Sequence, residues 1–451
     1  MAVFERKIWK DMVYWKDNLS TDHSLLIEGA RRVGKTTIVK KFAEDFYKSS
    51  IIVDFSKPRD GILELFEKGA GDLDRFFLHL QRIMKTELVT GESVIVLDEI
   101  QLCPPARQMI KHLVADGRYR YIETGSQISL RQNVRNILVP SEEHRIRMYP
   151  MDFEEFLWAN GDRITMDVVR DAYLKSTPMG RYAHDAAMEM FRLYMLVGGM
   201  PKVVTTFLEK NSFEMVEQEK RGILELYRED LGKIKNDHTG KCKRIFNSIP
   251  GLLTRHDKSF KANAVRRYSR TEDYLDAINS LDESRTVNVC RKCDDPDPAM
   301  DMYEDEMGFK LYMADTGLLF TAAFESNIGD RDEIYSLILK DKLSVNQGMF
   351  FENVVAQELR SSGRELLYSR FKTKDTVNTQ EVDFIMASGS RIIPLEVKSS
   401  ASNRHVSLDR FIEKYSKRVK QAYVIHTKDL RVDGMITYVP AYMISLIGSK
   451  N

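Results

Sequence analysis

The sequence predicts an α/β fold built on a parallel sheet with helices on both faces, and two observations carry this prediction. The apolar run Ser24–Ile27 is followed by a glycine-rich stretch at 29–37 and then by apolar residues at helical spacing. A second unbroken apolar run, Ser93–Leu97, ends in the carboxylates Asp98 and Glu99. Buried parallel strands have this unbroken apolar character because both of their faces are covered.

The stretch at 29–37 reads Gly-Ala-Arg-Arg-Val-Gly-Lys-Thr-Thr and matches the pattern GxxxxGK[ST] between a predicted strand and a predicted helix. Gly29 and Gly34 let backbone N–H groups turn inward around an anion, and the helix directs its positive end to the same place. Lys35 is expected to reach the terminal phosphates, and the Thr36 hydroxyl to hold Mg²⁺. The predicted nucleotide-binding residues are Gly29, Ala30, Arg31, Arg32, Val33, Gly34, Lys35, Thr36 and Thr37.

Asp98 and Glu99 would lie at the carboxyl edge of the sheet, where open α/β sheets bind ligands. We expect Asp98 to act on the magnesium through its water shell and Glu99 to polarise the attacking water. The alternative is a strand that ends in acidic surface residues.

Two further predicted strands supply candidate catalytic residues. Thr124 and Ser126 end the first of them, 119–126, and are candidates to contact the γ-phosphate or the attacking water; a turn satisfied by hydroxyl groups is the alternative. Arg145 lies on the second, 144–149, and is a candidate charge-neutralising arginine, or else a solvated residue of the strand.

The length of 451 residues indicates several domains, and 43% hydrophobic with 30% charged residues excludes a disordered or fibrous chain. The 68 basic residues balance 67 acidic ones, so the overall charge gives no reason to expect nucleic acid or a membrane. No apolar run has the length of a membrane span, and the charged start does not resemble a signal peptide, so a cytoplasmic location is expected. Cys290 and Cys293 are expected to be reduced thiols on a hairpin, since the other two cysteines form no matching pair for zinc.

The residues GARRVGKTT, IVLDE, ETGS and YPMDFEEF together resemble bacterial and archaeal AAA-type ATPases of the additional-strand division of P-loop proteins. The segments Leu196–Pro201 (LVGGMP) and Leu226–Asp230 (LYRED) extend the resemblance past the ATPase core. The resemblance implies ATP as the nucleotide, and one strand between the phosphate-loop strand and the Asp98 strand. Many such proteins carry an uncharacterised C-terminal domain.

Four domains are predicted: a P-loop AAA-type ATPase core, a helical lid, a winged-helix module and a C-terminal α/β domain, at 1–160, 161–235, 236–320 and 340–451. In the lid, Gly198-Gly199 and Pro201 would separate a helix at 186–197 from one long helix at 203–231.

Lys and Arg dominate residues 233–270, and a helix from Thr271 and two strand-like segments, 286–289 and 308–313, follow them. Helices followed by a hairpin resemble a winged-helix module, whose basic surface is a candidate to dock on DNA phosphates. A solvated lid surface is the alternative.

In the last domain, Asp383 lies on one predicted strand, and Glu396 and Lys398 lie on one face of the next. This arrangement resembles the PD-(D/E)xK nuclease core, with Val382 in place of the proline. The resemblance implies that Asp383 and Glu396 bind Mg²⁺ with the helical Glu352, and that Lys398 orients or deprotonates water. Divergent members of the group include proteins that do not cut, and a hairpin with cross-strand ion pairs is the alternative.

Three functions stay open at this stage. The chain is an ATP-hydrolysing switch or motor with DNA-facing domains, an ATP-regulated Mg²⁺-dependent DNA endonuclease, or a regulatory interaction protein that holds ATP without hydrolysing it. DNA would contact the region 233–270 and the C-terminal domain. An arginine supplied by a neighbouring subunit would require a homo-oligomer.

Overall fold

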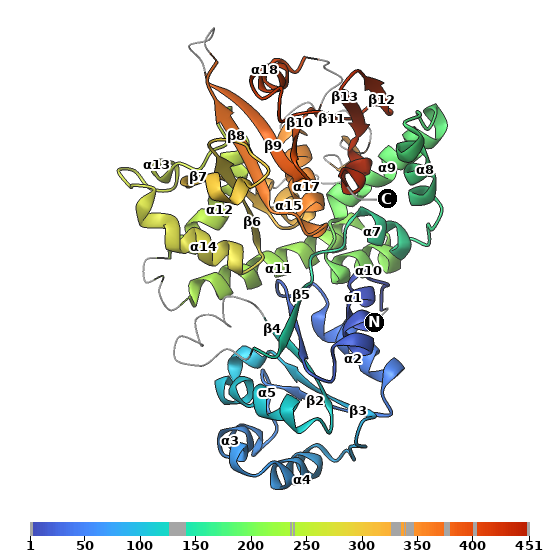
Figure 1. Cartoon of the computed structure of the whole chain (residues 1–451), viewed down its shortest axis with the longest axis vertical. Helices are drawn as coiled ribbons and strands as arrows, with labels where there is room; N and C mark the ends of the chain where they lie inside the picture. The colour runs from blue at the N-terminus through green and yellow to red at the C-terminus, as the bar shows by residue number, and fades with distance from the viewer. Residues whose placement is uncertain are drawn as a thin grey trace. The chain divides into compact units, whose positions relative to one another are not determined.

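The computed structural model describes two compact units, Met1–Tyr149 with Glu283–Arg285, and Pro150–Asp282 with Thr286–Asn451 (Figure 1). Within them, the described residues are 3–125, 141–234, 237, 240–325, 335–337, 339, 347–373, 379–399 and 404–448.

The first unit contains a five-stranded, wholly parallel sheet in the order β2-β3-β4-β1-β5. Its strands are β1 (Ser24–Glu28), β2 (Ser49–Asp54), β3 (Ser93–Asp98), β4 (Arg120–Gly125) and β5 (Glu143–Arg147). Because β4 lies between β1 and β3, the additional strand implied by the family resemblance is confirmed.

Helices cover both faces of this sheet (Figure 1). They are α1 (Ile8–Asn18), α2 (Lys35–Phe46), α3 (Ile62–Lys68), α4 (Leu73–Met84) and α5 (Pro104–Asp116). Alternate strand residues such as Ile95 and Leu97 share one apolar core with Phe66 and Phe77 of α3 and α4. Helix α1 packs on α2, since its Trp9 ring lies 5.2 Å from the ring of Phe42.

The second unit begins with helices α7 (Phe153–Ala159), α8 (Thr165–Lys175), α9 (Arg181–Val197), α10 (Pro201–Lys210) and α11 (Phe213–Gly232). The prediction of one helix over 203–231 is wrong, because the helix is interrupted at Asn211, whose backbone is left-handed with φ 48°. Ser212 then caps α11 by accepting a hydrogen bond from the Met215 amide. No helix among the described residues has the length and apolarity that crossing a membrane requires.

An eight-stranded mixed sheet completes the second unit, in the order β12-β13-β11-β10-β9-β8-β6-β7. The strands are β6 (Val287–Cys293), β7 (Glu304–Met313), β8 (Leu366–Phe371), β9 (Gln380–Ser388), β10 (Arg391–Val397), β11 (Ala422–His426), β12 (Arg431–Asp433) and β13 (Ile436–Pro440). The remaining helices are α12 (Lys241–Leu253), α13 (Ala262–Val265), α14 (Leu275–Glu283), α15 (Thr316–Ala323), α17 (Gln347–Ser361) and α18 (Val406–Lys414).

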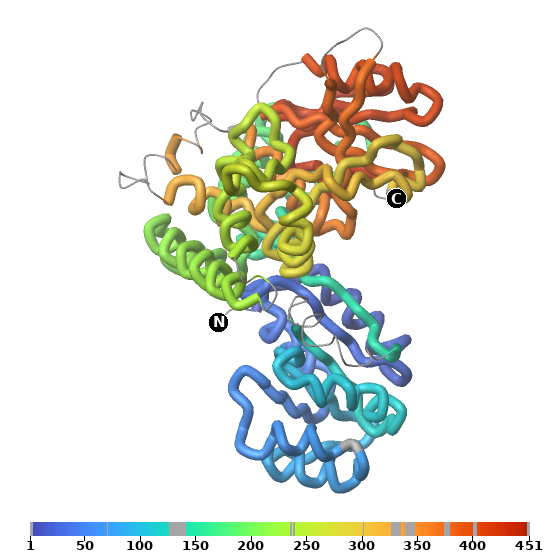
Figure 2. The backbone as a smooth tube through the Cα atoms, turned by 90° about the vertical axis from the view of Figure 1, so that its left-hand side faces the viewer, coloured from blue at the N-terminus to red at the C-terminus, as the bar shows by residue number. Residues whose placement is uncertain are grey.

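The β6–β7 hairpin, which the sequence predicted as part of a separate winged-helix module, belongs to this sheet. Strand β6 pairs in parallel with β8, so that Cys290 lies opposite Leu366, and the hairpin forms one edge of the C-terminal sheet. Figure 2 shows the yellow hairpin beside the orange strands that follow it in the sheet. The predicted division between 236–320 and 340–451 therefore does not separate two sheets. Cys290 and Cys293 are free thiols on β6.

Helix α17 explains why the helical region and the C-terminal sheet form one unit. The Glu358 carboxylate accepts hydrogen bonds from the Phe153 amide of α7 at 3.0 Å and from the Tyr194 hydroxyl of α9 at 2.8 Å. Gln357 accepts from the amide of Thr316 at the start of α15 at 2.8 Å. These groups are buried, so each bond satisfies an atom that would otherwise lose its contact with water.

Candidate functional site

The glycine-rich stretch connects β1 to α2 in the predicted way, with the helix beginning at Lys35. Gly34 at the N-cap has φ 103°, a conformation that a side chain would strain. A Cβ on Gly29 would lie 2.3 Å from the carbonyl oxygen of Met148, so only glycine allows the segment after β5 to pass this close.

Arg6 fixes the back of the same loop, a role that the sequence patterns did not reveal. Its guanidinium donates to the Val33 carbonyl inside the loop at 3.0 Å and to the Tyr149 carbonyl at 2.6 Å. The loop and the last residues of the first unit are therefore joined through one buried side chain.

The Lys35 ammonium lies within the loop, where it donates to the carbonyls of Gly29 at 2.9 Å and Ala30 at 3.0 Å. Burial lowers the pKa of Lys35, and the nearby carboxylates of Glu99 and Asp98 oppose that shift. This positive charge is placed to meet an anion that enters the loop from the side of the α2 N-terminus.

Thr36, Asp98 and Thr124 form a hydrogen-bonded group that fits a magnesium site. The Thr36 hydroxyl lies 3.0 and 2.9 Å from the two carboxylate oxygens of Asp98, and the Thr124 hydroxyl also donates to Asp98. Burial raises the pKa of Asp98, and the two threonine hydroxyls lower it. Hydroxyl and carboxylate oxygens suit Mg²⁺, so Thr36 would hold the ion directly and Asp98 would hold it through its water shell.

Glu99 follows β3 in a left-handed conformation, with φ 55°, which is uncommon for a residue with a side chain. Its backbone amide donates to the Thr124 hydroxyl at 3.2 Å, and its carboxylate accepts from the side-chain amide of Gln101. The turn sends the Glu99 and Asp98 side chains in different directions from adjacent positions. Ser126, the other candidate on this side, lies outside the described residues.

The structure does not bring Arg145 to the phosphate loop. Its guanidinium pairs with Glu143 at 2.9 Å, and Glu143 also makes a two-bond pair with the buried Arg107. Glu143 lies opposite Ser24, at the amino end of β1, whereas the loop follows the carboxyl end of that strand. The prediction of a charge-neutralising role for Arg145 in its own subunit is not supported by this position.

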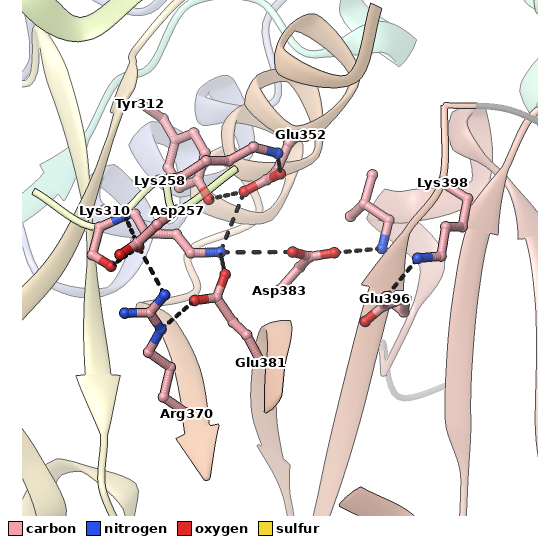
Figure 3. A network of polar contacts seen from close by, with 12 residues as sticks. Asp257, Lys258, Lys310, Tyr312, Glu352, Arg370, Glu381, Asp383, Glu396 and Lys398 are labelled. Carbon is pink, nitrogen blue, oxygen red and sulfur yellow. Dashed lines mark hydrogen bonds and ion pairs between the residues drawn. The ribbon is translucent and has the colours of Figure 1, made fainter. Parts of the chain in front are cut away.

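The acidic residues predicted in the C-terminal domain lie together, but around a lysine (Figure 3). Lys310 Nζ on β7 lies 2.7 Å from Glu381, 3.4 Å from Glu352 and 3.6 Å from Asp383. The sequence patterns gave no sign of Lys310, because it comes from the hairpin that was assigned to another module.

The other groups of this cluster are paired as well. Glu352 also contacts Lys258 and accepts from the Tyr312 hydroxyl at 2.6 Å, while Lys398 donates to Glu396 at 2.7 Å. Burial raises the pKa of Glu396 to about 7, and Asp383 adds to that shift. Burial would also raise the pKa of Glu352, but Lys310 and Lys258 hold it below its ordinary value.

Solved structures similar to this chain include a Walker-type ATPase of Pyrococcus abyssi, at 14% identity, with 71% of this chain and 96% of that chain covered and a TM-score of 0.41. The Drosophila ORC bound to DNA is 12% identical, with 72% and 96% covered and a TM-score of 0.26. Cdc6p of Pyrobaculum aerophilum is 12% identical, with 75% and 94% covered and a TM-score of 0.24. These similarities are too low to assign a function.

No curated protein matches the chain significantly. Three family matches divide it: an AAA domain at 21–157, a domain of unknown function (DUF8612) at 188–330 and a domain of unknown function (DUF4143) at 347–444. The first match contains the phosphate loop, Asp98, Glu99 and all five strands of the parallel sheet. Residues 21–157 are therefore a P-loop ATPase domain of the AAA type.

Proposed function

We propose that this chain binds ATP with Mg²⁺ in the first unit, hydrolyses it, and couples the state of the nucleotide to a second unit that contacts DNA. The observation that carries the proposal is the meeting of Thr36, Asp98 and Thr124 at the carboxyl edge of the sheet, with Glu99 next to them.

The phosphate loop would bind the nucleotide through groups that already face inward. Backbone amides at the start of α2 and the Lys35 ammonium would neutralise phosphate oxygens, and Lys35 would exchange its two carbonyl contacts for them. Mg²⁺, when bound, supplies further neutralisation of the phosphate charge. Thr36 would hold the ion, and Asp98 would orient its water shell.

Glu99 would be the residue of this group that acts on water. Its carboxylate would accept the proton of the attacking water, while the Thr124 hydroxyl holds the Glu99 backbone in its left-handed turn. The side-chain amide of Gln101 donates to the same carboxylate. Glu99 would therefore have to leave Gln101 when the nucleotide binds before it could accept a proton from water.

Coupling to the second unit would begin at the loop itself. Gly29 lies against Met148, and Arg6 joins Val33 to Tyr149. Tyr149 immediately precedes Pro150, the first residue of the second unit. A change in the loop on phosphate release would therefore be felt at the start of the second unit.

The end of the basic stretch 233–270 offers a candidate surface for DNA contact. Lys258 and Lys261 pair with acidic residues of the same unit, whereas Arg266, Arg267 and Arg270 are exposed. Tyr268 between them is 87% exposed, and the Arg267 guanidinium lies 5.2 Å from the centre of its ring. Arginines beside an exposed aromatic ring suit phosphate contact and base stacking, so this segment is our candidate DNA surface.

Steady-state phosphate release with and without DNA tests the ATPase assignment. Glu99→Gln should lower the rate about 100-fold or more, because removing a general base costs that much, while ATP binding is kept. Glu92→Gln, an exposed glutamate of the same unit that pairs with Lys48, is the matched control and should keep the wild-type rate. A protein that retains ATP but releases no phosphate even as wild type would favour a regulatory ATP-binding protein.

A further inference from the structure

The position of Lys310 gives the acidic cluster of the second unit an internal cation. The lysine comes from β7, and its side chain is completely buried. Its ammonium lies among carboxylates from two other elements, Glu352 on α17 and both Glu381 and Asp383 on β9 (Figure 3). A metal ion bound by the nuclease-like residues would share these same carboxylates.

The charges around Lys310 are balanced without a metal. Five carboxylates face five cations: Asp257, Glu352, Glu381, Asp383 and Glu396 against Lys258, Lys261, Lys310, Arg370 and Lys398. A divalent cation needs carboxylate or other oxygens as ligands, and a lysine or arginine that already contacts those oxygens competes with it. The described residues contain no group of three or more acidic, histidine or cysteine side chains arranged to hold a metal.

Most carboxylate oxygens of Asp383 and Glu396, the two predicted metal ligands, already contact other groups of the protein. One oxygen of Asp383 accepts from the Val397 amide at 2.9 Å, and the other lies 3.6 Å from Lys310. One oxygen of Glu396 accepts from Lys398, and its second oxygen is buried without a hydrogen-bond partner among the described residues. An ion that used this oxygen together with Asp383 would meet the positive charge of Lys310, so the cluster does not fit the Mg²⁺ that the nuclease resemblance implies.

Lys310 also has a structural reason to be there. Strand β7 is the edge of the eight-stranded sheet, and the Lys310 side chain passes over β6 and β8 to reach β9, with its ammonium 5.0 Å from the ring centre of Tyr368. Removing it would leave the buried Glu352 and the partly buried Glu381 and Asp383 without the cation that they share, which is unfavourable.

We propose that Lys310 replaces the metal ion of a nuclease-like site, so that this cluster fastens the β6–β7 hairpin to the C-terminal sheet and does not cut DNA. The second unit is then a DNA-facing or partner-facing domain whose acidic residues serve its fold. This inference is independent of ATP hydrolysis in the first unit.

Binding of Mn²⁺ to the full-length protein without nucleotide tests the proposal, with Asp98→Asn present throughout to remove the ATP-site ligand. The protein with Lys310 should bind no Mn²⁺ and gain no thermal stability from it. Lys310→Met should melt several degrees lower, and Mn²⁺ should bind and restore the loss by neutralising the released carboxylates. Lys292→Met is the matched control, since Lys292 on the same hairpin also pairs with two acids, Asp294 and Asp305. Its melting temperature should not respond to Mn²⁺.

Two results would overturn the proposal. One is Mn²⁺ bound to the protein that keeps Lys310, with binding lost in Asp383→Asn or Glu396→Gln. The other is Mg²⁺-dependent nicking of supercoiled DNA that disappears in the same variants. Both use proteins that retain Lys310, so they decide the question even if Lys310→Met does not fold.

Discussion

A single buried carboxyl makes the stability of the first unit depend on pH. Glu123 on β4 is fully buried, and the Ser24 hydroxyl donates to one of its oxygens at 2.7 Å. Burial, and then the neighbouring Glu143, raise the pKa of Glu123 to about 8. The neutral acid is therefore the form that the folded sheet holds at neutral pH.

The sign of the pH effect follows from this raised pKa. Between the ordinary value of 4.5 and about 8, the unfolded chain loses a proton that the folded chain keeps. Stability should therefore fall as the pH rises through this window, by at most about 1.4 kcal/mol per pH unit. Glu123→Gln should remove this contribution, because the amide is neutral at every pH.

Urea unfolding of the two proteins at pH 5 to 8 measures the difference. The stability of Glu123→Gln relative to wild type should rise steadily with pH and level off near pH 8. A difference that stays constant across the range would mean that Glu123 is ionised in the folded sheet. Glu92→Gln, at an exposed position, provides the control without a pH-dependent difference.

Single residues also show what sequence patterns reveal about a site. Lys35, Thr36, Asp98 and Glu99 were identified because a short motif and the end of an apolar strand determine their places locally. Arg6 and Lys310 were missed, since each acts on residues far away in the sequence. The role of Arg145 stays a prediction: its guanidinium pairs with Glu143, and a strand pattern does not say which end of the strand a long side chain turns to.

Among the elements, the junction of α9 and α10 depends on a glycine. The amide of Gly199 donates to the buried Asp315 at 2.6 Å, and its carbonyl accepts from Met151 at 2.7 Å. A Cβ at Gly199 would lie 2.1 Å from the Met151 carbonyl oxygen, which is backbone and cannot turn away. This contact joins the segment before α7 to the start of α10.

Gly199→Ala should therefore destabilise the second unit by several kcal/mol, about the cost of a severe core clash. Gly222→Ala is the matched control, because Gly222 lies inside α11 with open space around its Cβ position. That change should be neutral or stabilise by about 0.5–1 kcal/mol, since alanine favours a helix. Thermal unfolding of both variants measures the contrast, and equal stabilities would contradict the described packing at Gly199.

Elements were predicted well where their signals are local. Strands β1, β3, β4 and β5 of the first sheet and the β9–β10 hairpin lie where the sequence patterns indicated. The break at Asn211 was missed because apolar residues continue at helical spacing on both sides of it. The place of the β6–β7 hairpin depends on parallel pairing with β8, about 75 residues further along the chain, and no local pattern encodes such pairing.

For the whole molecule, our proposal makes DNA contact through Arg266, Arg267 and Arg270 the link between ATP turnover and a target. Arg266→Glu with Arg267→Glu should weaken binding to duplex DNA. The slope of log Kd against log salt concentration should fall by up to the share of about two phosphate contacts. Lys417→Glu with Lys420→Glu changes the charge equally at exposed positions elsewhere in the unit and is the control. Equal affinity of both double variants for DNA, measured over a range of salt concentrations, would remove this surface from the proposal.

Hydrolysis at the carboxyl edge of the first sheet is the step on which the proposed coupling depends. The most direct measurement is the identity of the nucleotide held by wild type and Glu99→Gln after one round of incubation with ATP and Mg²⁺, quenched and separated. Wild type should hold or release ADP, whereas Glu99→Gln should hold uncleaved ATP at the same occupancy. ADP formed equally fast by both proteins would contradict the role of Glu99.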